Sequence, residues 1–568
     1  MLRSDDTDKG AKRTEHEDRF DRQLRLWGSH GQKFLESTHI CALGSGATIS
    51  EMLKNLVLPN ISQFTIIDDA TITEEDNGNN FFVSEDDIGK PRGQVVCANL
   101  LEMNPWDEKQ QFGVRGHFIN QSPEKAIAEN IDAFKKFDIV VATEIHDKPM
   151  LQLSNFCYKH NIAFVLIRIH GLLGYIHWSM KEHCIEETHP SDEDVTDVYL
   201  HEDQLRIFPE YAKFVQSFDF KQIRKDPHHH RHVPWPAIVY HQLQEWKKKK
   251  DGATPKTWKE KSEFKQQIQA AALVYHEEMN FHEAVRNAHK ACAKPTLTYE
   301  LTKVLADDSA KKLTSNTKPF WFVIHGIIKF MEKDSQGFLP VCASIPDMTS
   351  LPEMYVKLQK LFRARERQDL DKITAHVNAA LESVGKEKGS ISTDYIDRIA
   401  KHIRTVSTVR CQKIETAYDA KQSNADDLNE IFSEWEEPKK WDVEADGPPP
   451  IQPKNIYWYF GMRAAERFRT KKGRYPGAGK EEDVGDDTKA LTEIMTTMFK
   501  EYHIQSKIEP AICQEIVRFG AKEIHNTAAM VGGVASQMCL KLIVKQFTPF
   551  DNIFVFNGVH CTSNVYKF

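Results

Sequence analysis

The sequence predicts an α/β protein in which a Rossmann-like, doubly wound domain is interrupted by a large, mainly helical insertion. Short apolar runs alternate with helical patterns over residues 1–180, which is typical of α/β domains. The strand pattern nearly disappears over residues 181–481 and returns over residues 482–568. A single core rarely serves more than roughly 250–300 residues, so a chain of 568 residues is expected to hold at least two domains.

The first strand, helix and strand of the chain indicate a parallel sheet. Residues 39–43 form an apolar run that ends in a Gly-Ser-Gly turn, and apolar residues then recur at helical spacing over residues 49–57. A second apolar run covers residues 64–67 and ends in Asp68. This order is that of a βαβ unit.

The remaining elements are predicted from the same patterns. Nearly continuous runs of Val and Ile indicate strands that are covered on both faces. Further strands are expected at residues 114–119, 137–142, 163–167, 173–180, 552–556 and 563–568. Helices are expected at residues 91–103 and 521–544, and within the insertion at 258–279, 320–331, 355–381, 394–406 and 456–471.

Charge and composition argue against several classes of partner. The 75 Lys and Arg residues are outnumbered by 82 Asp and Glu residues, so clustered positive charge for a nucleic acid is not expected. No apolar run is expected to reach the roughly 18–20 residues of a membrane helix. The ten cysteines include no C-x-x-C pair, which predicts free thiols in the cytoplasm or nucleus.

The glycine turn is the first candidate site. Gly44 and Gly46 lie between a strand and a helix, where unpaired N–H groups and the positive end of the helix dipole suit a phosphate. Asp68 follows Gly44 by 24 positions, near the offset of a ribose-binding acid. Ile49 stands where a dinucleotide fingerprint has its third glycine. The turn therefore indicates a Rossmann-like fold and leaves open a nucleotide pocket or a plain βα corner.

A histidine cluster is the other candidate site. His228, His229, His230 and His232 lie close together in the sequence. Consecutive side chains diverge, and no paired cysteine or nearby carboxylate completes a ligand set. A surface loop is the expected structure, and no metal site is predicted.

Several stretches resemble the adenylation domain of enzymes that activate ubiquitin-like modifiers. They are D-R-Q-L-R-L-W-G at residues 21–28, E-x-x-K-N-L-V-L at 51–58, D-I-G-K-P at 87–91 and V-G-G-V-A-S-Q at 531–537. With its length and its large insertion, the chain is most similar to the regulatory subunits of heterodimeric enzymes that activate the neddylation modifier. Residues 339–348 resemble those subunits too, so the resemblance covers essentially the whole chain and implies an adenylation-type fold.

The resemblance implies that the nucleotide pocket is degenerate. Active members of the family adenylate the carboxyl end of the modifier with ATP and magnesium. The family's catalytic arginine is here Asn79, its glutamine is Asn80 and its lysine is Arg92. An acid is replaced by Ala70, and the metal-binding aspartate falls at Glu144. The degenerate pocket is therefore expected to consist of Gly44, Gly46, Asp68, Asn79, Asn80 and Arg92, with no catalytic residue and no metal of its own.

The resemblance also implies how the chain takes part in catalysis. It predicts a heterodimer with a catalytic subunit that holds ATP and magnesium, and a groove for the ubiquitin-like modifier. In the family the arginine that corresponds to Arg22 reaches the ATP phosphates in the partner's pocket. The alternative role for Arg22 is a cap or salt bridge within its own helix.

Two other functions remain open on the sequence alone. One is a free-standing NAD- or FAD-dependent oxidoreductase, against which Ile49 argues. The other is the small subunit of the SUMO-activating enzyme, whose helical insertion is shorter in that family.

Overall fold

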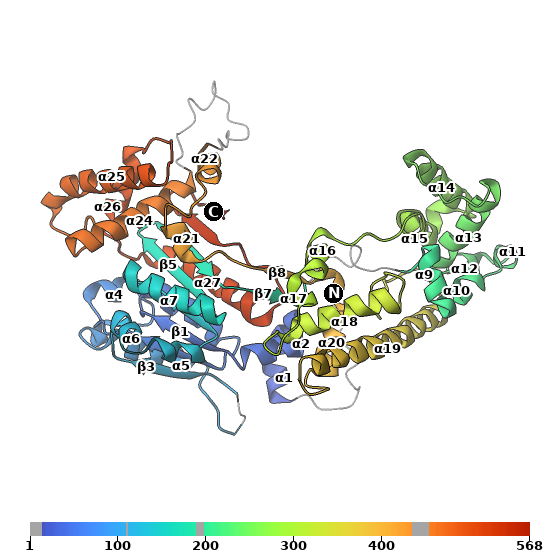
Figure 1. Cartoon of the computed structure of the whole chain (residues 1–568), viewed down its shortest axis with the longest axis horizontal. Coiled ribbons are helices and arrows are strands. Elements are labelled where there is room, and N and C mark those ends of the chain that lie inside the picture. Colours follow the sequence, from blue (N-terminus) through green and yellow to red (C-terminus); the bar gives the residue numbers. More distant parts are fainter. Residues whose placement is uncertain (1–13, 110–111, 189–197, 434–453, 568) are drawn as a thin grey trace. The chain divides into compact units, whose positions relative to one another are not determined.

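The computed structural model describes residues 14–109, 112–188, 198–433 and 454–567, and it consists of two compact units (Figure 1). The α/β unit comprises Met1–His183 and Val409–Phe568, and the helical unit comprises Cys184–Thr408. The predicted class, a Rossmann-like domain interrupted by a helical insertion, is confirmed.

An eight-stranded mixed sheet forms the centre of the α/β unit, in the order β10-β9-β6-β5-β4-β1-β2-β3. The five strands from β5 to β3 pair in parallel, and β6, β9 and β10 pair antiparallel at the other end. The strands are β1 (His39–Leu43), β2 (Gln63–Ile67), β3 (Arg115–Ile119), β4 (Ile139–Ala142), β5 (Ala163–His170), β6 (Leu173–Ser179), β9 (Ile553–Asn557) and β10 (Thr562–Tyr566). The carboxyl ends of β1, β2 and β4 meet at one edge, where α/β sheets bind ligands.

Helices cover both faces of this sheet, as the continuous apolar strands predict. Along β1, Ile40 and Ala42 join one core, whereas Cys41 and Leu43 join the other, because side chains alternate between the faces of a strand. The first core includes residues of α2 (Asp21–Leu35), α3 (Ala47–Val57), α5 (Arg92–Met103) and α27 (His525–Val544). The second includes residues of α7 (Asp147–His160), α21 (Ile414–Tyr418), α22 (Ala425–Ser433), α24 (Asn455–Lys472), α25 (Val484–Glu501) and α26 (Pro510–Arg518).

The second core shows why the predicted domain boundary at residue 481 differs from the structure. The residues of α24 and α21 fall within the predicted insertion, 181–481, but Ile456 and Ile414 pack in the same core as Val140 of the sheet. The chain therefore returns to the α/β unit at Val409 rather than at 482. Helical periodicity identifies the helix but not the core against which it packs.

One helix of the described part of the chain, α27, is long and apolar enough to cross a membrane by length and composition. This differs from the expectation that no apolar run reaches that length. Its apolar window is 67% buried within the protein. Gly532 lies so close to α3 that a Cβ atom would be 2.8 Å from the Thr48 carbonyl oxygen. Close packing against α3 therefore accounts for the apolar and small residues of α27.

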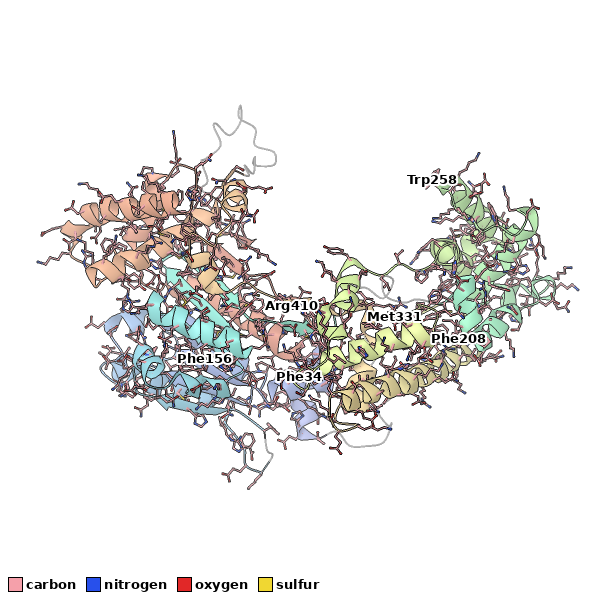
Figure 2. All side chains as sticks on the ribbon, viewed as in Figure 1. Phe34, Phe156, Phe208, Trp258, Met331 and Arg410 are labelled. Atoms are coloured by element: carbon pink, nitrogen blue, oxygen red, sulfur yellow. The ribbon has the colours of Figure 1, made fainter. Side chains whose placement is uncertain are left out.

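The helical unit has two apolar cores that share one long helix, α19 (Pro352–Ser383). Phe362 of α19 packs in the first core, where its ring lies 5.3 Å from that of Phe208. Figure 2 labels Phe208. Ile373 and Val377 pack in the second core. The other helices are α9 (Glu202–Ile207), α10 (Pro209–Gln216), α11 (Phe220–Ile223), α12 (Pro227–His230), α13 (Trp235–Lys249), α14 (Trp258–Ala271), α15 (Met279–Asn287), α16 (Tyr299–Ala306), α17 (Asp308–Lys311), α18 (Pro319–Lys333) and α20 (Thr393–Lys401).

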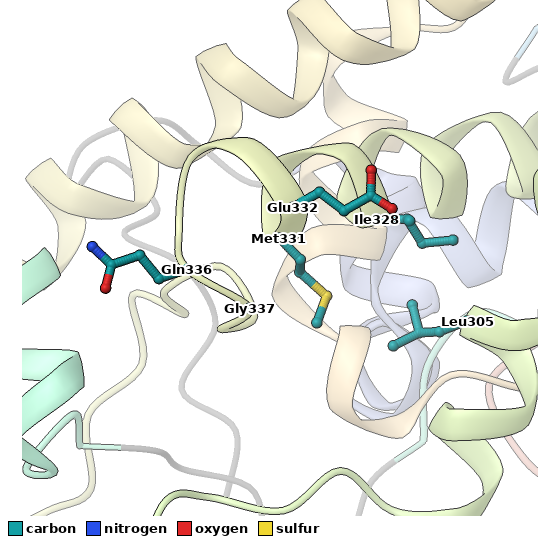
Figure 3. A pocket seen from close by; sticks show the side chains of 6 residues that line it. All are labelled: Leu305, Ile328, Met331, Glu332, Gln336 and Gly337. Atoms are coloured by element: carbon teal, nitrogen blue, oxygen red, sulfur yellow. The ribbon is translucent and has the colours of Figure 1, made fainter.

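The helical unit contains the predicted histidine cluster and, separately, a cavity. His228 to His230 belong to a short helix rather than a loop, and His230 is buried with its Nδ1 atom 2.8 Å from the Glu278 carboxylate. Within the described ranges no group of three or more His, Cys, Asp or Glu residues is placed to hold a metal. A cavity of about 380 Å³ is lined by Leu305, Ile328, Met331, Glu332, Gln336 and Gly337 (Figure 3). None of the residues predicted for the nucleotide pocket lines this cavity.

Candidate functional site

The glycine turn between β1 and α3 is built as the sequence predicts. Gly44 has a φ of +103°, a conformation that favours glycine, and a Cβ atom there would lie 2.7 Å from the Thr143 hydroxyl oxygen. Gly46 is the residue before α3 begins, and a Cβ atom there would lie 2.9 Å from Oε2 of Glu523. The backbone conformation at residue 44 therefore favours glycine, and the space beside Gly46 already holds a carboxylate of the same chain.

Arg92 brings the acidic residues of the site together. Its buried guanidinium donates to the carboxylates of Asp68 at 3.2 Å, Asp76 at 3.0 Å and Glu144 at 2.8 Å. Burial alone would lower the pKa of Arg92, but the Glu144, Asp68 and Asp76 carboxylates raise that pKa well above its ordinary value. Arg92 therefore stays charged at the carboxyl edge of the sheet.

Asp68, the predicted ribose-binding acid, is fully engaged within the chain. Its Oδ2 atom accepts hydrogen bonds from Arg92 and from the hydroxyl of Ser45. Its Oδ1 atom accepts the backbone N–H of Ala70 at 3.0 Å. Both carboxylate oxygens thus have partners that belong to the protein, and the acid lies in the predicted place.

The two asparagines of the predicted pocket, Asn79 and Asn80, have structural partners. Asn80 is buried, and its amide donates to the Ser45 carbonyl oxygen at 3.2 Å and to the Ser50 hydroxyl at 3.2 Å. Asn79, the last residue of α4 (Glu74–Asn79), donates to the Glu523 carbonyl oxygen at 3.1 Å. All six residues predicted for the degenerate pocket therefore gather at one edge of the sheet.

Glu523 and Asp76 complete the site, and sequence reasoning missed both. The Glu523 carboxylate accepts the backbone N–H of Thr48 at 3.1 Å and its hydroxyl at 2.7 Å. Burial raises the pKa of Glu523, and the nearby Glu144 carboxylate raises it further. Glu523 and Thr48 are 475 positions apart, so no spacing signal links them.

Arg22 lies away from this cluster on α2 and is exposed. Within the part of the chain that the structure describes, it forms no hydrogen bond or ion pair. Asp21 instead pairs with Arg25, the residue one turn along α2, at 3.0 Å. The alternative in which Arg22 caps or bridges its own helix is therefore not what the described residues form.

Asp147, a partly buried acid three residues after Glu144, gives a testable pH dependence. Burial raises the pKa of Asp147 from 3.8 to about 6, and Glu466 raises it further, whereas Arg168 lowers it. The folded chain thus holds this proton more tightly than the unfolded chain, so the stabilisation is complete below pH 4 and is lost as the pH rises towards 6. In wild type, the unfolding free energy should fall by about 2 kcal/mol over this pH range because Asp147 loses its proton. The Asp147→Asn variant has no such proton to lose and should not show this fall.

Urea unfolding of both proteins between pH 4 and pH 7 measures this difference. The difference in unfolding free energy between wild type and Asp147→Asn should change steadily over that range and then level off. Parallel pH profiles for the two proteins would contradict the assignment of the proton to Asp147.

Comparison with known proteins defines the class first. The model of the ThiF family matches residues 20–567, and the chain belongs to this family. The fold and the glycine turn described above are thus those of a ThiF-family protein.

Within the ThiF family, the chain is similar to one type of enzyme subunit. The chain is 34% identical over 560 residues to the NEDD8-activating enzyme E1 regulatory subunit of Xenopus laevis, covering 97% of this chain and 98% of that protein. Identity to the subunit of the same name is 33% in Gallus gallus, covering 97% and 98%, and 32% in Danio rerio, covering 98% and 99%. These relatives confirm the resemblance to regulatory subunits, and their coverage includes the helical insertion.

Proposed function

We propose that this chain is the non-catalytic, regulatory subunit of a heterodimeric enzyme that activates the ubiquitin-like modifier NEDD8. The partner in the heterodimer would be a catalytic subunit that carries out adenylation and thioester formation. Similarity to regulatory subunits over nearly the whole chain, insertion included, supports this function over an oxidoreductase or a SUMO-type subunit. Ile49 argues against the oxidoreductase alternative, because it is buried in the core instead of leaving the space of a third glycine.

The observation that carries the proposal is the Arg92 cluster, because it does not fit bound ATP and magnesium. The carboxylates of Asp68, Asp76 and Glu144, which are the groups here that suit a cation, each already pair with the Arg92 guanidinium. A phosphate at the start of α3 would meet the Glu523 carboxylate and be repelled. Asn79 and Asn80 themselves supply no positive charge for a phosphate, and their amides donate to the Glu523 and Ser45 carbonyl oxygens.

In this proposal ATP and magnesium lie in the partner's site, and this chain contributes three things. Arg22 would reach the phosphates in that site, as an arginine supplied in trans does in other phosphoryl-transfer enzymes. The α/β unit would bind the catalytic subunit. The helical unit would form part of the groove for NEDD8, and the complex would work in the cytoplasm and nucleus.

ATP–pyrophosphate exchange tests the proposal directly. We expect no exchange from the isolated chain with NEDD8, and full exchange once the catalytic subunit is added. The catalytic subunit alone serves as the control and should be weakly active, since it would lack Arg22. Robust exchange by the isolated chain would overturn the non-catalytic assignment, and activation of another modifier by the pair would overturn the NEDD8 assignment.

A further inference from the structure

We propose that the Glu523 carboxylate is the resident anion of the phosphate slot at the start of α3, held there by a closing segment formed by residues 519–525. The pocket would thus be closed by the chain itself, and not only deprived of catalytic residues. This inference deepens the proposed function and rests on it for the role of the pocket; the contacts that carry it are independent of that function.

The start of α3 offers hydrogen-bond donors to an anion. Helix α3 has 11 residues, and the N–H of Thr48 in its first turn has no acceptor within the helix. The two carboxylate oxygens of Glu523 accept this N–H and the Thr48 hydroxyl, at 3.1 and 2.7 Å. The carboxylate also lies at the positive end of the helix dipole. Glu523 thus makes the contacts that a phosphate oxygen would make at this position.

The space beside Gly46 fits the Glu523 carboxylate. A Cβ atom on Gly46 would lie 2.9 Å from Oε2 of Glu523 and 3.4 Å from Oε1 of Glu144. A glycine that would let a phosphate approach the backbone therefore lets this carboxylate approach instead. Any side chain at residue 46 would displace Glu523.

Contacts with two further elements hold the closing segment in place. Gly171, just after β5, donates its N–H to the Lys522 carbonyl oxygen at 2.9 Å. The Lys522 ammonium group pairs with Glu75 of α4 at 3.2 Å. Backbone and side-chain contacts from β5 and α4 thus place the segment across the carboxyl edge of the sheet.

Asn79 also binds the closing segment. Its side-chain amide donates to the Glu523 carbonyl oxygen at 3.1 Å, and its own carbonyl oxygen lies 3.0 Å from Nδ1 of His525. An arginine at this position would carry its charge several ångströms beyond that amide. The residue that replaces the family's catalytic arginine therefore anchors the segment that fills the phosphate slot.

Inorganic phosphate and the Glu523→Ala variant test the inference. We expect the variant to unfold about 2–5 °C below wild type, because it loses the cap of α3. Adding 50 mM phosphate should restore about half of this loss, since the vacated slot then accepts the anion. Sodium chloride at matched ionic strength should not, and neither salt should distinguish wild type from a control variant, Glu493→Ala, whose side chain is exposed on α25.

Two results would overturn the inference. One is an unchanged unfolding temperature in Glu523→Ala, and the other is a phosphate effect no larger than in wild type. If Glu523→Ala does not fold, amide exchange in Glu523→Met decides, because methionine keeps the length of the side chain without a carboxylate or amide acceptor. The Thr48 N–H should exchange faster in this variant than in wild type, and equal rates would contradict the inference. Both measurements use the chain alone, without ATP or the catalytic subunit. A negative result in them therefore bears on the Glu523 contacts, whereas a negative result in the exchange assay bears on the proposed function.

Discussion

Replacing Arg22 by alanine should lower ATP–pyrophosphate exchange by the heterodimer about ten- to a hundredfold. Arg22 is exposed on α2, and within the described ranges its guanidinium has no hydrogen bond or ion pair. It is therefore available to a phosphate group outside this chain. Loss of one charge-assisted contact to phosphate corresponds to roughly 1.4–2.8 kcal/mol of transition-state stabilisation. Initial rates of exchange at saturating NEDD8 measure the effect.

Arg25 provides a matched control on the same helix. It is also an exposed arginine, but it pairs with Asp21 at 3.0 Å within the chain. Arg25→Ala should leave exchange within about twofold of wild type, because the loss of a surface ion pair changes little. Co-elution of each variant with the catalytic subunit shows that assembly is intact. Equal exchange rates for Arg22→Ala and wild type would remove Arg22 from the proposed role.

The fold could be predicted largely because its local signals are strong. The βαβ unit, the buried strands and the long helices α18 and α19 each show a clear period in the sequence. The extent of the insertion could not be predicted as well. The apolar face of α24 looks the same whether it packs on the sheet or on other helices, and only the fold shows Ile456 and Phe164 in one core.

The candidate site was predictable where its residues lie near strand ends. Gly44, Gly46 and Asp68 follow β1 and β2, so the topology brings them together at the carboxyl edge. Glu523 could not be predicted to join them, because it comes from the other end of the chain. Asp76 was also missed, because its sequence context suggests only a residue in the first turn of α4. In the structure it also forms a capping box with Thr73 at the start of that helix.

The same cluster explains how a sheet edge lined with acidic residues can stay compact. Three carboxylates at a sheet edge would repel one another if no cation lay between them. Arg92 supplies that cation, and Ser45 and Ala70 complete the hydrogen bonds of Asp68. The charges at this edge thus pair with one another within the folded chain.

Replacing Arg92 by methionine should therefore destabilise the α/β unit by about 3–5 kcal/mol. Methionine keeps the length and apolar stem of the side chain but leaves Asp68 and Asp76 buried without a counter-charge. Removing one partner of a buried ion pair is costly because the remaining charge keeps its desolvation penalty. Urea unfolding followed by circular dichroism measures the change in the unfolding free energy.

Lys90 provides the comparison for a lost positive charge without burial. It lies two residues before Arg92, is mostly exposed and pairs with Asp87 at 2.8 Å. Lys90→Met should change the unfolding free energy by less than about 1 kcal/mol. Adding Asp68→Asn and Asp76→Asn to Arg92→Met should recover part of the loss, because the uncompensated charges are then removed. If Arg92→Met were as mild as Lys90→Met, the guanidinium would not be what holds the acids of this edge together.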